Sequence, residues 1–204
     1  MVSVYLWWPN LIGYARIVSL GVALFYAMRS PMQAGLCYAV SQLLDAVDGV
    51  VARAVNQCSK FGALLDMLTD RMSTTCLLVV IATKDPSRWA FFTFIIVLDL
   101  VAHWAQMYSS LMAGIQSHKE NTNPILKFYY SFPFLLLFCV GNEAFIIGTY
   151  LELFPAALPP AFLTAVRAIK YVCLPVFLGK NFFNVVQLVE SSNRLVRLDR
   201  PKPH

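Results

Sequence analysis

Long apolar stretches recur along most of this chain, and they restrict its possible folds more than any other feature. Six of them, each of roughly 20 residues, are long enough to cross a bilayer as a helix. Their approximate ranges are 11–28, 34–56, 62–83, 89–112, 128–150 and 161–189. Because 58% of the 204 residues are hydrophobic and 13% are charged, no room remains for a separate soluble domain. The sequence therefore predicts an all-α polytopic membrane protein, a bundle of about six transmembrane helices that forms a single domain over residues 1–204.

Four aspartates interrupt this apolar pattern between residues 45 and 70. Asp45 and Asp48 are three residues apart and Asp66 and Asp70 are four apart, so each pair projects from one face of its helix. A short polar turn at residues 56–61 joins the two helices, which can therefore face each other with the carboxylates between them. Ionised carboxylates in apolar surroundings need a neutralising cation, and oxygen ligands favour Mg²⁺ or Mn²⁺ over zinc. The pattern predicts a metal site near one membrane surface.

Small and basic residues lie beside these carboxylates. Gly49 and Gly62 remove side-chain bulk, which lets the phosphates of a ligand or a neighbouring backbone come close. Arg53 supplies a forked cation suited to phosphate oxygens. The alternative interpretation needs no ligand, because in it the aspartates only form ion pairs with Arg53, Arg71 or Lys180.

The spacing of these residues resembles the signature of the CDP-alcohol phosphotransferases at every fixed position, reading Asp45-x2-Asp48-Gly49-x2-Ala52-Arg53-x8-Gly62-x3-Asp66-x3-Asp70. Members of that family transfer a phosphatidyl or phospho-alcohol group from a CDP-linked donor to an alcohol and release CMP. The resemblance implies two metal ions held by the four aspartates, with Asp70 also acting as the general base. It further implies that the cytidyl diphosphate of the donor contacts Gly49, Arg53 and Ser59, and that Gly62 leaves space for it.

Within this family, the segments PNLIGYARI, LLDAVDG and FGALLDMLTDR most resemble the eukaryotic branch that uses myo-inositol as its acceptor. That resemblance implies CDP-diacylglycerol and myo-inositol as substrates, and a homodimer in the endoplasmic reticulum membrane. Two alternatives stay open. One is a different acceptor, namely glycerol 3-phosphate, serine, choline or ethanolamine, and the other is a cation or proton transporter. Transport is disfavoured because its path needs polar groups spread through the bilayer, whereas these carboxylates cluster near one surface.

Fewer polar residues interrupt the apolar stretches of the second half. Lys180 and Asn184 share a helical face with Gln187, which predicts an acceptor-binding site or, for Lys180, a partner for the acidic cluster. Asp99 and His103 are four residues apart, so they either satisfy each other or orient the acceptor.

The distribution of basic residues predicts the orientation in the membrane. With six spans, the membrane side that carries more basic residues includes Arg16, Arg53, Lys60 and a basic tail at about 190–204. The positive-inside rule assigns this side to the cytosol. Arg16 is expected to extend its long side chain to the membrane surface. The net charge of +5 is dispersed or terminal, which fits a membrane surface and predicts no nucleic-acid partner.

Overall fold

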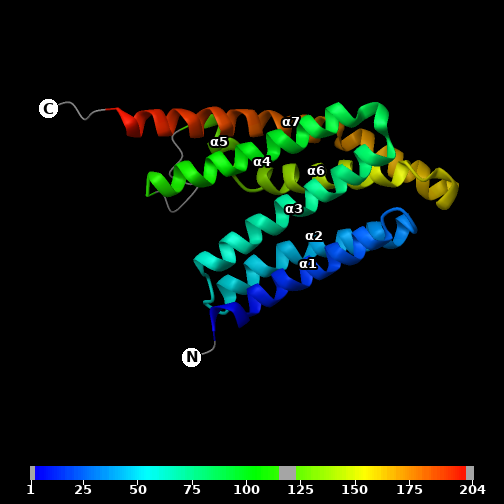
Figure 1. Ribbon diagram of the computed structural model, residues 1–204, viewed down its shortest axis with the longest axis horizontal. Helices are drawn as coiled ribbons and strands as arrows, with labels where there is room; N and C mark the ends of the chain where they lie inside the picture. Colours follow the sequence, from blue (N-terminus) through cyan, green and yellow to red (C-terminus); the bar gives the residue numbers. More distant parts are fainter. Residues whose placement is uncertain (1–2, 115–122, 201–204) are drawn as a thin grey trace. The chain divides into compact units, whose positions relative to one another are not determined.

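Helices make up almost all of the computed structural model, which describes residues 3–114 and 123–200 (Figure 1). No strand occurs among these residues, so the all-α prediction is confirmed. The six long helices and one short one are α1 (Trp8–Tyr26), α2 (Pro31–Ala54), α3 (Lys60–Lys84), α4 (Trp89–Met112), α5 (Pro124–Tyr129), α6 (Phe134–Glu152) and α7 (Pro160–Asp199). Short 3₁₀ turns lie at Val4–Leu6, Pro86–Arg88 and Pro155–Ala157.

Five helical segments within the described residues are long and apolar enough to span a membrane, where the sequence predicted about six. They are α1, α2, α4 with the turn before it, α6 and α7. The difference concerns α3, whose 25 residues are sufficient in length but include Asp66, Asp70 and Arg71 between a lysine at each end. The prediction of a polytopic membrane protein is confirmed, and the charges in α3 explain the smaller number of apolar spans.

The hairpin of α2 and α3 carries both halves of the aspartate motif. Asn56 follows α2 with a positive φ of 53°, a left-handed conformation that asparagine tolerates better than most residues. Ser59 then caps α3, because its Oγ accepts a hydrogen bond of 2.9 Å from the backbone N–H of Gly62. This capped turn fixes where α3 begins, and hence the height at which Asp66 and Asp70 face α2.

The described residues form two compact units. The first comprises residues 1–86 and 146–167, and in it α1 packs along α2 and also contacts α3. Ser41 of α2 donates from Oγ to the main-chain oxygen of Arg16 at 3.1 Å, in the buried interface with α1. Tyr150 donates from its hydroxyl to the main-chain oxygen of Ala27 at 2.7 Å. These buried bonds hold α1 in position, so the face of α1 that bears Arg16 is turned inward.

The second unit comprises residues 87–145 and 168–204. Aromatic packing joins its helices, and Tyr129 stacks on Phe183 with ring centroids 4.6 Å apart. Gly141 of α6 faces Val176 of α7 so closely that a Cβ there would lie 2.5 Å from Val176 Cγ1. Only glycine permits this approach of the two helices.

Candidate active site

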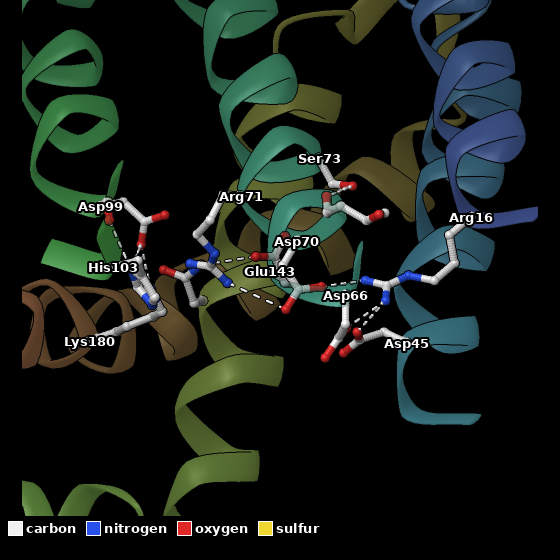
Figure 2. Close-up of polar contacts among 12 residues, drawn as sticks. Arg16, Asp45, Asp66, Asp70, Arg71, Ser73, Asp99, His103, Glu143 and Lys180 are labelled. Carbon is white, nitrogen blue, oxygen red and sulfur yellow. Dashed lines mark hydrogen bonds and ion pairs between the residues drawn. The ribbon is translucent and has the colours of Figure 1, made fainter. Parts of the chain in front are cut away.

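The four predicted aspartates converge on a single guanidinium, that of Arg16 in α1. Figure 2 shows Arg16 with three of them, Asp45, Asp66 and Asp70. Arg16 Nη1 lies 2.7 Å from Asp45 Oδ1, 2.9 Å from Asp48 Oδ2 and 2.9 Å from Asp66 Oδ1. Its Nη2 donates to Asp70 Oδ1. Three helices of the first unit therefore build the cluster, since α1 supplies the arginine while α2 and α3 each supply two carboxylates.

Arg16 lies in the interior of the protein, so the expectation that it extends to the membrane surface is wrong. Its side chain is 0% exposed, although it is a long cation on an apolar helix. The reason is electrostatic. Contact with four carboxylates compensates the lost hydration of one guanidinium.

The aspartates themselves are more accessible than the arginine. The side chains of Asp45, Asp66 and Asp70 are 37%, 49% and 26% exposed, and that of Asp48 is nearly buried. The carboxylates of Asp45, Asp66 and Asp70 are therefore accessible from outside the protein.

The charges of this cluster do not balance. Arg16 contacts all four aspartates and Arg71 approaches one of them, with Nη2 3.6 Å from Asp70 Oδ2. Two cations cannot neutralise four carboxylates. Carboxylate oxygens of Asp45, Asp48 and Asp66 also lie within 4.8 Å of one another. Excess negative charge on converging hard oxygen atoms fits a divalent cation such as Mg²⁺ or Mn²⁺.

A cleft of about 170 Å³ opens beside the carboxylates, within the first unit. Its walls come from the beginning of α1, the end of α2 and the beginning of α3. The residues that the family resemblance assigned to the donor all line it. They are Gly49, Arg53, Ser59 and Gly62, together with Asp48 and Asp66 of the acidic cluster.

Glycine at position 62 preserves space in this cleft. A Cβ added there would lie 3.0 Å from Asn10 Oδ1 and 3.1 Å from Ser59 Oγ, both tighter than ordinary contact. At Gly49 the nearest atom to an added Cβ would be Arg53 Nη1, at 3.5 Å, which is an ordinary contact. Of the two glycines that the family resemblance assigned to the donor, Gly62 is therefore the one at which added bulk changes the cleft more directly.

The sequence-based site lacked three residues that the structure places in it, namely Arg16, Asn10 and Gln57. Asn10 is buried, donates from Nδ2 to Val4 O at 2.6 Å and lines the cleft. Gln57 also lines the cleft, and its Oε1 accepts from the backbone N–H of Trp8 at 2.9 Å. A signal for two of them was present, because Asn10 and Arg16 flank Gly13 at three-residue spacing on one helical face.

A second polar cluster lies in the second unit. Asp99 Oδ1 accepts from Lys180 Nζ at 2.9 Å and from Asn184 Nδ2 at 3.1 Å, and all three residues are buried. His103 Nδ1 lies 3.6 Å from the same carboxylate oxygen and 2.8 Å from the main-chain oxygen of Asp99. Lys180 is thus the ion-pair partner of Asp99, where the sequence left a choice between an acceptor site and the acidic cluster.

The ion-pair interpretation of the four aspartates named Arg53, Arg71 and Lys180 as their cations. Arg71 approaches Asp70, Lys180 pairs with Asp99, and Arg53 lines the cleft. The principal cation is Arg16, which that interpretation did not include.

Comparison with known proteins agrees with the family resemblance of the motif. The model of the CDP-alcohol phosphatidyltransferase family matches residues 6–154. The CDP-diacylglycerol--inositol 3-phosphatidyltransferase of Homo sapiens is 40% identical, with 97% of this chain and 94% of the relative covered. The proteins of the same name from Schizosaccharomyces pombe and Drosophila melanogaster are 37% and 45% identical, covering 97% and 73% of this chain and 92% and 66% of the relatives. No solved structure gives a significant match. The chain therefore belongs to the CDP-alcohol phosphatidyltransferase family.

Proposed function

We propose that this chain transfers the phosphatidyl group of CDP-diacylglycerol to myo-inositol, giving phosphatidylinositol and CMP. The family assignment and the names of its relatives support this reaction. The observation that carries it is the cleft, in which the donor residues of the family motif meet the edge of a carboxylate cluster with excess negative charge.

The donor would bind with its cytidyl diphosphate in the cleft. Arg53 offers a planar fork for phosphate oxygens, and the backbone N–H groups at the beginning of α3, next to Ser59, favour negative charge. Gly49 and Gly62 let the diphosphate approach the backbone. The diacylglycerol part would extend along the apolar outer surfaces of the helices into the lipid.

Asp45, Asp48, Asp66 and Asp70 would hold two ions of Mg²⁺ or Mn²⁺. When bound, the cations supply positive charge that neutralises the pyrophosphate and the leaving CMP. The geometry favours this role because two of the carboxylates, those of Asp48 and Asp66, line the same cleft.

Asp70 is proposed as the general base. Its carboxylate is accessible, and contact with Arg16 and Arg71 orients it. An inositol hydroxyl loses its proton to Asp70, its oxygen forms a bond to the phosphatidyl phosphorus, and the bond from that phosphorus to CMP breaks. Transfer is direct, because the described residues that line the cleft include no paired nucleophile and base of the Ser/His or Cys/His type.

Lys180 and Asn184 are proposed to bind the acceptor. Both are buried polar groups in α7, a helix with a stretch apolar enough to span a membrane, and an asparagine amide can donate to and accept from hydroxyls. The proposed setting is the endoplasmic reticulum membrane, with the active site facing the cytosol, where nucleotide-linked donors are delivered, and with a homodimer as the assembly.

A panel of labelled acceptors tests the function. Purified protein with CDP-diacylglycerol and Mn²⁺ should incorporate myo-inositol into lipid, whereas inositol phosphate, glycerol 3-phosphate, serine, choline and ethanolamine should not react. A variant carrying Asp70→Asn serves as the control for enzyme-dependent incorporation. Comparable incorporation of another acceptor, or release of CMP that does not require inositol, contradicts the proposal.

A further inference from the structure

We propose that Arg16 is an internal counter-cation that competes with divalent cations for the aspartate cluster and thereby sets their affinity. The inference deepens the proposed function and rests on its metal site. It assigns a role to a residue that contributes neither a metal ligand nor a contact with the donor in that proposal.

The first observation is where the guanidinium nitrogen lies. Arg16 Nη1 is 2.7 to 2.9 Å from one oxygen of each of Asp45, Asp48 and Asp66. The same three aspartates are those whose carboxylate oxygens lie within 4.8 Å of one another. A single nitrogen thus occupies the point on which three potential metal ligands converge. A cation that uses these oxygen atoms must share them with Arg16 or displace it.

The second observation is the environment of the arginine. Its side chain is fully buried, and its Nε has no hydrogen-bond partner among the described residues. A buried N–H without a partner is unfavourable, so the guanidinium is held through its two Nη atoms and not through Nε. The four carboxylates hold it, and partial release of those carboxylates leaves the charge of Arg16 nearby.

The third observation is the charge balance. Four carboxylates with Arg16 alone carry three excess negative charges, and without Arg16 they carry four. Repulsion among them opposes the packing of α1, α2 and α3 when no cation is bound. Arg16 therefore stabilises the cluster before metal entry and lowers its affinity for the metal.

Binding of Mn²⁺ to the full-length protein in detergent, without substrate, tests this directly. Free Mn²⁺ is measured by electron paramagnetic resonance for the wild type, Arg16→Gln and Arg16→Lys. The matched control is Arg167→Gln, which removes an exposed arginine paired with Glu152 at 3.0 Å in the same unit. For Arg16→Gln we expect Kd to fall about tenfold or more, because a unit charge at contact distance from a divalent ion contributes more than the energy equivalent of one decade. Arg16→Lys should give an intermediate Kd, and Arg167→Gln should give the wild-type value.

Thermal unfolding supplies a second measurement. Without metal, Arg16→Gln should melt at a lower temperature than the wild type, and saturating Mn²⁺ should raise its Tm by more than it raises that of the wild type. If Arg16→Gln is recovered folded only in the presence of Mn²⁺, this also supports the proposal. If it is not recovered at all, the Kd of Arg16→Lys decides, and a value equal to or above that of the wild type overturns the proposal.

The outcomes separate the competition by Arg16 from the metal site of the proposed function. If the wild type binds Mn²⁺ and Arg16→Gln binds it equally or more weakly, Arg16 is not a competitor, and the metal site of the proposed function is unaffected. If neither the wild type nor the Arg16 variants bind Mn²⁺, the metal site itself is wrong and the inference fails with it.

Discussion

Replacing Gly62 with alanine should impair donor binding while leaving stability nearly unchanged. The added Cβ would lie 3.0 Å from Asn10 Oδ1 and 3.1 Å from Ser59 Oγ, so both side-chain ends must move by a few tenths of an ångström. Displacement of Ser59 weakens the cap of α3, at a cost of about 0.5–2 kcal/mol. Alanine in place of glycine within a helix regains about 0.8–1 kcal/mol. These two effects nearly cancel in the free energy of unfolding.

The free energy of donor binding in the cleft has no such compensating gain. A contact from Ser59 to a donor phosphate is a hydrogen bond to a charged group, and its loss costs about 1.5–3 kcal/mol, which corresponds to roughly a tenfold to hundredfold rise in KM for CDP-diacylglycerol. The assay is CMP release in mixed micelles with varied donor and saturating myo-inositol, alongside thermal unfolding of the same preparation. KM for myo-inositol should remain within about twofold of the wild type, since the Cβ lies against the proposed donor groups and not the proposed acceptor groups.

Gly21→Ala is the matched control, because it makes the same change in α1 where nothing lies within 4 Å of an added Cβ. It should gain about 0.8–1 kcal/mol of stability and keep the wild-type KM. An unchanged donor KM in Gly62→Ala refutes the assignment of this cleft to the donor. A large loss of stability together with a raised KM for the donor shows instead that α3 cannot accommodate the Cβ by side-chain shifts.

Four further predictions follow from the same contacts. Asp70→Asn keeps the shape of the side chain but removes the proposed base, so turnover should be lost while the melting temperature stays near that of the wild type; substantial CMP release by this variant contradicts the role. Direct transfer predicts inversion at phosphorus with a chiral thiophosphate donor, and retention indicates a covalent enzyme intermediate. Cys58 is exposed and lines the cleft, so a membrane-impermeant maleimide should label it in sealed microsomes, with Cys58→Ser as the control. Labelling only after permeabilisation reverses the proposed topology. Lys180→Met should destabilise the protein by about 3–5 kcal/mol by removing one partner of a buried ion pair, and the double variant with Asp99→Leu should recover most of that loss in thermal unfolding.

The sequence was sufficient to predict the parts of the site that depend on local spacing. Helical periodicity alone places Asp45 and Asp48, or Asp66 and Asp70, on one face, and the short turn between the helices brings the two pairs together. The carboxylate cluster follows from these two facts, and it is present in the structure. The family motif added Gly49, Arg53, Ser59 and Gly62, which the structure places around one cleft.

Partners that are distant in the chain were not predictable in this way. Arg16 is separated from Asp48, Asp66 and Asp70 by 32, 50 and 54 residues, and Lys180 from Asp99 by 81. Several cations in a membrane protein can neutralise a given carboxylate, and only helix packing determines which one is near. Its place in the first helix made Arg16 look interfacial, because a long side chain there can reach water. The rotation of α1, fixed by its packing on α2, turns it inward.

The two polar clusters differ in charge balance and in exposure, and this difference bears on their roles. In the second unit, Asp99 is matched by Lys180 and the neutral amide of Asn184, and all three residues are buried. In the first unit, four carboxylates exceed their cations, and three of them are substantially exposed. Excess charge that faces a cleft requires a ligand of opposite charge, whereas a balanced buried pair is already satisfied. We therefore expect the proposed metal and diphosphate chemistry in the first unit. An acceptor bound at Lys180 and Asn184 has to use the N–H groups of these side chains that do not already bond to Asp99. This favours a neutral polyol, because its hydroxyls can accept from these N–H groups without introducing a second negative charge next to Asp99.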